Sequence, residues 1–332
     1  MSILLVTRSD DNDSVRMVAD ALRHRGETPV RLNTDLYPES VRISTRYCGD
    51  HSQRILIDES GKRFDLGDMT ALWYRRFFAG GSLPADLGDM REPSVNEARR
   101  TLYGVIAAMG CFELDPLTAV RKTDHKELQL KLAHAHGLDT PRTLFTNDPA
   151  EALRFYEELG GRVVTKMQSS FAIYRGDEEM VVFTNPVKPE DLRDLSGLRY
   201  CPMTFQERVE KRLELRATVV GRMVFTSSID SQRSEKTSVD WRRDGIGLID
   251  DWKPYTLPRL VEEGLLAVME EFGLNYGAAD FIVNPEGRHV FLEINAGGEW
   301  FWLQRNPGLP IAEALASVLA GVAPRASARR SS

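Results

Sequence analysis

The chain has 332 residues, of which 42% are hydrophobic, so it is long enough for two or three domains and too apolar for a disordered protein. Its formal net charge of −6 argues against a general nucleic-acid binder, which usually carries a basic surplus. Cys48, Cys111 and Cys201 lie far apart, so their spacing indicates neither a zinc site nor a disulfide. The N-terminal apolar run is too short for a signal peptide, and no run approaches the roughly 20 apolar residues of a membrane span. We therefore expect a reduced, cytoplasmic protein that binds neither nucleic acid nor membrane.

Residues 1–118 are typical of an α/β unit. Ile3–Val6 predicts a buried strand, and Ser14 is a candidate cap for the helix that follows. Thr70–Tyr74 predicts a second strand, and helical sequence follows near Glu97–Met109. Because strands alternate with helices, we expect a partly parallel sheet in this domain.

A second unit of helices and strands is expected over residues 119–202. Lys126–His136 is rich in good helix formers, and Gly137 ends that helix. The remaining expected elements are, in chain order, a helix Pro149–Leu159, a strand Arg162–Lys166, a hairpin of Phe171–Tyr174 with Met180–Thr184, and a short helix Pro189–Leu195.

A third unit is expected over residues 203–323, followed by a flexible tail over residues 324–332. Trp300 and Trp302 belong either to its core or to the wall of a substrate site. The predicted elements are a strand pair Leu215–Val220 and Met223–Ser227, a helix Leu257–Phe272, a hairpin turning at residues 284–287, and a helix Ile311–Leu319.

The hairpin in the third unit carries three oxygen-bearing side chains. Glu293 and Asn295 lie two residues apart on one strand, so they point to the same face of the sheet. If the first residue of the turn 284–287 pairs with the last, Asp280 lies opposite Phe291 and shares the face of Glu293. The sequence therefore predicts that three oxygen side chains converge beside an apolar hairpin.

Oxygen ligands without sulfur or imidazole suit Mg²⁺ or Mn²⁺ rather than zinc. With few carboxylates, a cation bound there keeps positions for the phosphates of a nucleotide. The alternative is that these are ordinary polar residues near a sheet edge, which would be the preferred interpretation for a single acid.

A nucleotide would have to be held without the usual glycine-rich loops, because the chain contains neither a Gly-x-x-x-x-Gly-Lys-Ser/Thr nor a Gly-x-Gly-x-x-Gly motif. Lys166 follows a strand-like run and can place a charge on a phosphate oxygen, although a lone lysine is more often a solvated surface residue. Phe205–Val209 predicts a connecting strand whose backbone can pair with an adenine edge. Glu214 can accept hydrogen bonds from ribose, and Arg216 lies on the same strand face; cross-strand ion pairs are the alternative for both residues.

The order of these motifs resembles the ATP-grasp superfamily over roughly residues 120–320. The resemblance implies an ATP-grasp fold of class α/β with α+β subdomains, preceded by an N-terminal α/β pre-grasp domain. It rests on the stretch around Lys126, Gly137-Leu-Asp-Thr-Pro-Arg-Thr, Val-Val-Thr-Lys166, Phe-Gln-Glu207-Arg-Val, Glu214-Leu-Arg216, Asp280 and Glu293-Ile-Asn295. Two departures are Met167 in place of a frequent proline and the absence of a glycine-rich loop after Lys166.

The resemblance also implies roles for individual residues. Lys126 and Lys166 match two phosphate-binding lysines, and Glu214 matches the acid that binds ribose. The residues that match the adenine side are Gln206, Glu207 and Val209, with Leu292 as the apolar floor beneath the base. The metal ligands are matched by Asp280, Glu293 and Asn295, which implies ATP with two Mg²⁺ ions, and Arg216 matches a basic residue near the transferred phosphate.

A closer resemblance, to the peptide-modifying ATP-grasp ligases of graspetide pathways of the microviridin and plesiocin type, spans nearly the whole chain. It rests on Leu5-Val-Thr-Arg-Ser-Asp10, Trp73-Tyr-Arg-Arg76, Ser231-Gln-Arg233, Asp240-Trp-Arg-Arg243 and Asn295-Ala-Gly-Gly-Glu-Trp300. The implied activity is that of an ADP-forming macrocyclase, which activates Asp or Glu side chains of a ribosomally made precursor as acyl phosphates. It then joins them to Thr or Ser hydroxyls as esters, or to Lys amines as amides. A homodimer is also implied.

The implied partner is a precursor peptide with a leader and an acidic core, which needs local positive charge on an acidic enzyme. Each candidate arginine could equally be a solvated surface charge; the candidates are Arg75, Arg76, Arg233, Arg242 and Arg243. The hairpin at residues 171–184 and the helix at 189–195 match the region that recognises the leader, with a lid over ATP as the alternative.

Two other functions are considered. One is an ATP-grasp ligase of free amino acids or dipeptides. The other is a non-catalytic module that binds ATP and peptides, which the complete set of metal ligands and both lysines argues against.

Overall fold

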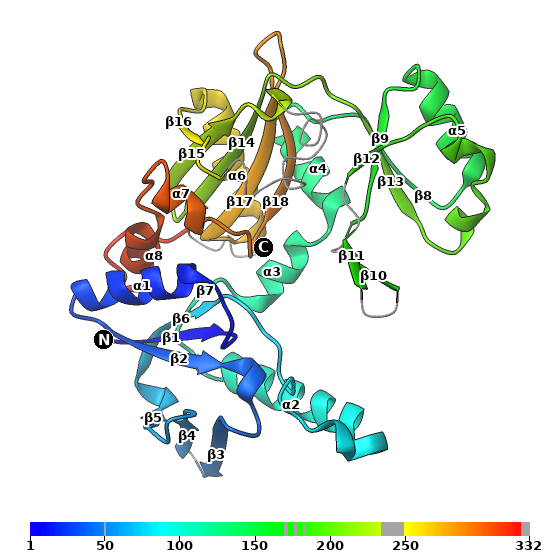
Figure 1. Cartoon of the computed structure of the whole chain (residues 1–332). Helices are drawn as coiled ribbons and strands as arrows, with labels where there is room; N and C mark the ends of the chain where they lie inside the picture. Colours follow the sequence, from blue (N-terminus) through cyan, green and yellow to red (C-terminus); the bar gives the residue numbers. More distant parts are fainter. Residues whose placement is uncertain (50, 169–171, 176–177, 182–183, 234–248, 327–332) are drawn as a thin grey trace.

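The computed structural model describes residues 1–49, 51–168, 172–175, 178–181, 184–233 and 249–326. Figure 1 shows three groups of strands, and the helices α3 (Leu117–Thr123) and α4 (Lys126–Ala135) lead from the first group toward the third. This arrangement agrees with the predicted N-terminal α/β domain followed by two further units. Among the described residues, no helix is both long enough and apolar enough to span a bilayer.

The first unit is built on a parallel sheet with the order β2-β1-β6-β7. Side chains on β1 alternate between two cores: Ile3 and Leu5 pack in the cluster that contains α1 and α8, whereas Leu4 and Val6 pack in the cluster that contains α2. The elements are β1 (Ser2–Thr7), β2 (Thr28–Asn33), β6 (Met69–Tyr74), β7 (Phe112–Leu114), α1 (Asp13–His24), α2 (Arg91–Ala107) and, from the C-terminal end of the chain, α8 (Ile311–Leu319).

Two details of this unit differ from the sequence prediction. The cap of α1 is Asn12 rather than Ser14: the Asn12 side chain accepts a hydrogen bond from the Ser14 backbone N–H, and Ser14 lies inside the helix. A small antiparallel sheet, which the sequence analysis did not predict, consists of β3 (Arg42–Cys48), β4 (His51–Ile57) and β5 (Arg63–Asp65).

The second unit carries an antiparallel sheet of short strands in the order β12-β9-β13-β8. Its sheet includes residues 203–207, so it continues past the predicted boundary at residue 202. The elements are β8 (Thr143–Thr146), α5 (Pro149–Glu158), β9 (Val163–Lys166), β12 (Asn185–Pro186) and β13 (Met203–Glu207), with β10 (Ala172–Arg175) and β11 (Glu178–Val181) as a separate hairpin. The predicted helix over residues 189–195 is wrong, since only a 3-10 turn at Asp191–Arg193 is present there.

The third unit is a five-stranded antiparallel sheet in the order β16-β15-β14-β17-β18. On β14, Leu215, Ala217 and Val219 pack with α6, so Arg216 and Thr218 point to the other face. Trp300 and Trp302 lie in the core cluster of that face, which supports their assignment to the core. The elements are β14 (Leu213–Val220), β15 (Met223–Ile229), β16 (Lys253–Tyr255), α6 (Arg259–Phe272), β17 (Tyr276–Val283), β18 (His289–Asn295) and α7 (Phe301–Arg305).

The pairing of β17 with β18 differs from the predicted register. Asp280 lies opposite Glu293 rather than Phe291, because Phe281 pairs with Phe291 and the register shifts between Asp280 and Phe281. Leu292 is the extra residue of this β-bulge. The prediction that Asp280 and Glu293 share a face is nevertheless correct, since residues directly opposite in an antiparallel pair lie on the same side.

A buried carboxyl group joins the end of the first unit to the start of β17. Asp115 is 3% exposed and accepts hydrogen bonds from the backbone N–H groups of Asn275 and Tyr276, both at 2.8 Å, and from Asn275 Nδ2 at 3.1 Å. Burial raises the pKa of Asp115 to about 7, although its three hydrogen-bond donors act in the opposite direction. Asp115 thus fixes the point from which the central strand β17 starts.

We expect Asp115→Asn to destabilise the protein by about 1–3 kcal/mol, because an amide N–H replaces an acceptor and leaves a buried donor unpaired. Because the pKa is raised on folding, the wild type loses stability as the pH rises from the ordinary carboxyl range toward 7. The substitution should therefore cost more at about pH 5 than at about pH 8 when the free energy of unfolding is measured with urea. Asp89→Asn, at an exposed position, is the control, and a cost that grows with pH would contradict this assignment.

Candidate active site

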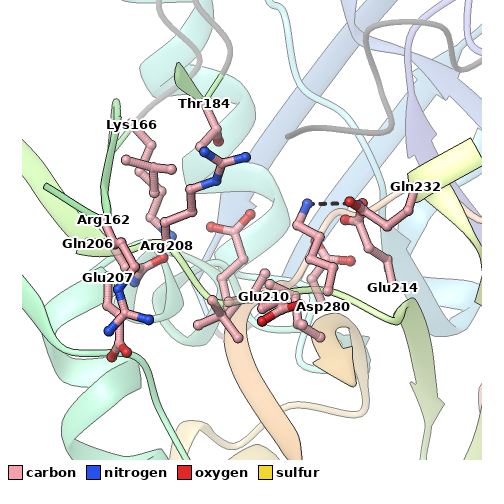
Figure 2. Close-up of a pocket in the computed structure, with 16 residues that line it drawn as sticks. Arg162, Lys166, Thr184, Gln206, Glu207, Arg208, Glu210, Glu214, Gln232 and Asp280 are labelled. Atoms are coloured by element: carbon pink, nitrogen blue, oxygen red, sulfur yellow. Dashed lines mark hydrogen bonds and ion pairs between the residues drawn. The ribbon is translucent and has the colours of Figure 1, made fainter. Parts of the chain in front are cut away.

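A cleft of about 340 Å³ lies between the sheet of the second unit and the sheet of the third. Its volume is in the range of small-molecule sites. Figure 2 shows Lys166, Thr184 and Arg208 on one side of the cleft and Glu214, Gln232 and Asp280 on the other. The lining residues are Arg162, Val164, Lys166, Thr184, Gln206, Glu207, Arg208, Val209, Glu210, Lys211, Glu214, Gln232, Asp280, Ile282, Leu292 and Glu293.

The bulge explains how two successive residues of β18 line the same cleft. In a regular strand Leu292 and Glu293 would point to opposite faces, but here both side chains line the cleft. Phe291 and Ile294, on either side of them, are buried in the core with α6. The hairpin therefore presents an apolar and an acidic side chain side by side.

The apolar part of the cleft includes side chains from β9, β17 and β18: Val164, Ile282 and Leu292. Gln206 is buried beside it, and Gln206 Nε2 donates to Thr143 Oγ1 at 2.9 Å. The sequence-predicted residues Lys166, Gln206, Glu207, Val209, Glu214 and Leu292 all line this cleft. Such a mixture of apolar wall and convergent polar groups suits a flat aromatic base with a polar edge.

Glu214 is held by partners that the sequence analysis did not predict. Its carboxylate lies 3.0 Å from Lys211 Nζ, and Ser231 Oγ donates to it at 2.6 Å. The alternative interpretation, a cross-strand ion pair, holds for Arg216, because its Nη1 pairs with Asp280 Oδ1 on the neighbouring strand β17 at 3.0 Å. The ion-pair partner of Glu214, by contrast, precedes its own strand. Glu214 thus remains at the cleft with two donors that fix its orientation.

Lys211 is one of the cleft residues that could not be predicted from the sequence. It lies in the turn before β14, and a lone lysine near a turn gives no sequence signal of its own. Its role becomes visible only in the structure, where the Lys211 ammonium group contacts the Glu214 carboxylate three residues further along the chain.

The carboxylates at the far end of the cleft are each balanced by a cation. Asp280 pairs with Arg216, and Lys126 Nζ lies 3.0 Å from Glu293 Oε2. Because Asp280 and Glu293 are opposite one another on β17 and β18, their mutual repulsion is offset by one cation each. Arg216 also lies over the Trp302 ring, with its guanidinium carbon 5.8 Å from the ring centroid.

Helix α4 is fixed on the edge of β18 by the side chain of Gln129. Its Nε2 donates to the carbonyls of Ile294, at 2.8 Å, and of Thr123, at 2.6 Å, and its Oε1 accepts from Ile294 N at 2.8 Å. The side chain of Gln129 thereby replaces a neighbouring strand at this edge. Lys126 lies one turn before Gln129, so this contact places the lysine beside Glu293.

Asn295 lies at the end of β18, opposite Ala278 in the register, and is exposed. Its Oδ1 accepts a hydrogen bond from Gly297 N at 2.9 Å. Asn295 is not among the cleft-lining residues, whereas Asp280 and Glu293 are. Within the described residues, no group of three or more His, Cys, Asp and Glu side chains is suited to hold a metal.

These donors fit a hard divalent cation. Two facing carboxylates and a nearby carboxamide supply oxygen atoms only, which Mg²⁺ prefers. They are too few to fill its coordination sphere, so phosphate oxygens and water would supply the rest.

The five arginines considered for peptide binding lie in different surroundings. The Arg75 side chain is 3% exposed and is enclosed by ion pairs with Asp11 and Glu299, so its position does not fit direct contact with a peptide. Arg76 is 40% exposed and pairs with the same two acids. The backbone of Arg233 belongs to a 3-10 turn, Ser231–Arg233, and its side chain lies outside what the structure describes, as do Arg242 and Arg243.

Comparison with known proteins gives matches over the full chain. The family of MvdD pre-ATP grasp domains matches residues 2–121, and no curated protein sequence matches. Macrocyclase MdnC from Microcystis aeruginosa MRC, in a crystal structure with precursor peptide MdnA, is 42% identical over 97% of this chain and 100% of that chain, with a TM-score of 0.87. A RiPP-associated ATP-grasp ligase from Chryseobacterium gregarium, in complex with ADP and a leader and core peptide, is 40% identical over 98% of both chains, with a TM-score of 0.91.

A more distant structure has the same fold. The ATP-grasp ligase PsnB, in complex with a phosphomimetic variant of a minimal precursor, Mg and ADP, is 21% identical over 97% of this chain and 98% of that chain, with a TM-score of 0.74.

We expect Leu292→Arg to weaken ADP binding at least about tenfold, because a charged side chain would replace the apolar wall of the cleft and lose burial worth about 1.5–3 kcal/mol. Isothermal titration calorimetry with ADP measures the loss. Leu260→Arg, at an exposed position on α6, should bind ADP like the wild type. Equal affinities for the wild type and Leu292→Arg would show that the nucleotide does not occupy this cleft.

Proposed function

The chain belongs to the ATP-grasp peptide ligases of graspetide biosynthesis, and we propose that it uses ATP to join Asp or Glu side chains of a precursor peptide to Thr or Ser hydroxyls, or to Lys amines, of the same peptide. The observation that carries this proposal is the pair of facing carboxylates, Asp280 and Glu293, each balanced by a cation at one end of a nucleotide-sized cleft. The full-length identity to MdnC, which was crystallised with its precursor, supports it.

The apolar side of the cleft suits the adenosine part of ATP. Leu292 would lie beneath the base, and the backbone groups of Gln206, Glu207 and Val209 would face its polar edge. Glu214, oriented by Lys211 and Ser231, would accept the ribose hydroxyls.

The triphosphate would lead toward the carboxylate end. Lys166, at the end of β9, and Lys126, on α4, would meet phosphate oxygens from two sides. Asp280, Glu293 and Asn295 would hold two Mg²⁺ ions. When bound, the ions neutralise charge on the phosphates and so assist phosphoryl transfer.

Activation is needed because a carboxylate is a poor electrophile. An oxygen of the peptide carboxylate attacks the γ-phosphorus of ATP, the new O–P bond forms, and ADP leaves with the electrons of the bond that breaks. A hydroxyl or amine of the same peptide then attacks the acyl carbon, inorganic phosphate leaves, and the proton of the nucleophile passes to phosphate or water. Because both groups belong to one chain, the second step is effectively intramolecular, which lowers its barrier by several kcal/mol.

Arg216 is suited to stabilise the negative charge that develops at the acyl carbon. It is buried in the sheet, reaches Asp280 and stacks on Trp302, so its guanidinium is held in place before the substrate binds. Fixed cations in a site that excludes water stabilise such charge without reorganisation.

The peptide would approach from the open side of this end of the cleft. Arg76, at the carboxyl edge of the first sheet, together with Arg233, Arg242 and Arg243, would supply positive charge for an acidic core. The hairpin β10–β11 and the 3-10 turn Asp191–Arg193 would bind the leader. We also propose that the enzyme acts as a homodimer.

Glu293→Gln should abolish ATP turnover that depends on precursor and Mg²⁺, because the neutral amide weakens cation binding and leaves Lys126 without its partner. Mass spectrometry of the precursor should show no species lighter by one water per bond. Glu286→Gln, on the exposed turn of the same hairpin, is the matched control and should form rings normally. Ring formation by Glu293→Gln at the wild-type rate would reject the proposed site.

Arg216→Met should reduce ring formation by about 100- to 1000-fold, the usual cost of losing one group that stabilises a developing oxyanion. ADP affinity should change far less, since Arg216 does not line the cleft. Arg222→Met, at the exposed turn between β14 and β15, is the control. A variant that loses ADP binding but retains normal turnover once saturated would contradict this role.

A further inference from the structure

A set of ion pairs ties the loop after β18, residues 296–300, to the first unit. Arg75 and Arg76 follow β6, Asp11 follows β1, and Glu299 lies in the loop itself. None of these side chains lines the nucleotide cleft. Their position between the first unit and the carboxylate end of the site therefore calls for a separate explanation.

Arg75 is the centre of this set. Its Nη1 donates to the carbonyl oxygen of Gly297 at 2.8 Å, and its Nη2 lies 2.5 Å from Glu299 Oε2. The guanidinium also lies near the Trp73 ring, 5.9 Å from its centroid. Because moving an ionised group out of water is costly, a buried arginine must be closely paired. Its closest partners, Gly297 and Glu299, belong to the loop, whereas Asp11 of the first unit lies 3.9 Å away.

Glu299 is held by the first unit on several sides. Asn12 Nδ2 donates to Glu299 Oε2 at 2.6 Å, and Arg76 pairs with Glu299 Oε1. Burial would raise the pKa of Glu299, but Arg75, the Asn12 side chain and Arg76 more than offset it and hold the pKa below its ordinary range. Glu299 is therefore ionised at neutral pH, so its contacts with the arginines are full ion pairs.

The same loop determines how Asn295 is oriented. Gly297 N donates to Asn295 Oδ1 at 2.9 Å, and Gly298 N donates to the Asn295 carbonyl at 3.2 Å. The hydroxyl of Tyr276 donates to the Gly298 carbonyl at 2.5 Å and fixes the loop against β17. Gly297 thus connects two functions: its carbonyl is bound by Arg75, and its N–H binds the Asn295 side chain.

We propose that Arg75 is a positioning residue for the divalent cation, because it holds the loop whose Gly297 N–H orients the Asn295 carboxamide. An amide oxygen has two lone pairs, so the hydrogen bond from Gly297 occupies one and directs the other outward for a ligand. The inference rests on the proposed function, which takes Asn295 as a cation ligand. It assigns to the first unit a part in cation binding although that unit does not line the nucleotide cleft.

Manganese binding in the presence of ADP tests this inference, with the free ion measured by electron paramagnetic resonance. Arg75→Met should weaken Mn²⁺ affinity about 10- to 100-fold, the usual effect of losing a residue that orients a metal ligand. Asn295→Ala should produce a similar loss. In the Asn295→Ala background, Arg75→Met should add little, because the two residues act through one contact.

Arg31→Met is the control, since Arg31 also donates to backbone carbonyls, those of Arg8 and Ser9, but within the first unit. If Arg75→Met does not fold, Arg75→Lys is the second variant. Lysine keeps the charge but cannot contact the Gly297 carbonyl and the Glu299 carboxylate at the same time, so we expect a smaller loss of Mn²⁺ affinity. Unchanged Mn²⁺ affinity, or equal losses with and without Asn295, would overturn the inference. A wild type that binds Mn²⁺ through Asn295 but leaves the precursor unchanged would instead refute the proposed function alone.

Discussion

Two negatively charged side chains, Asp280 and Glu293, face one another across β17 and β18, and the site is organised around their repulsion. Like charges at directly opposite positions of a sheet are destabilising. Here the neighbouring strand contributes Arg216 to one carboxylate, and helix α4 contributes Lys126 to the other. The site therefore holds two carboxylates balanced by two cations. Mg²⁺ and a triphosphate can offer each of these groups a new partner of opposite charge.

The three units each contribute a part to that set. The third unit carries both acids, the second carries the helix and strand that supply the lysines, and the first holds the loop after β18 through Arg75. The side chain of Gln129 fixes α4 to β18, and Asp115 fixes the start of β17 to the end of β7. The Gln129 and Asp115 side chains are both buried, and each hydrogen-bonds to the backbone of another unit. Losing either side chain would leave buried backbone groups unpaired and would destabilise the fold.

Much of this could be predicted from the sequence because it depends on local pattern and on motif order. The helices α4, α5 and α8 and the strand pair β14–β15 follow from periodicity and turn residues, and the cleft contains six of the predicted nucleotide residues. The bulge at Leu292 could not be predicted, because alternation alone places Leu292 and Glu293 on opposite faces. Contacts such as Ser231 with Glu214, or Arg75 with Gly297, depend on how segments far apart in the chain pack, and they leave no trace in local sequence.

Transfer of a labelled carboxylate oxygen to phosphate during ring closure is the most direct test of an acyl phosphate formed at this site. A precursor whose Asp and Glu side-chain oxygens carry the heavy isotope should transfer one labelled oxygen to inorganic phosphate for every bond that forms, because the carboxylate oxygen that attacks the γ-phosphorus leaves with it. Mass spectrometry of the phosphate and the peptide measures both products in one reaction. Rings that form while the phosphate stays unlabelled would contradict carboxylate activation by ATP at this site.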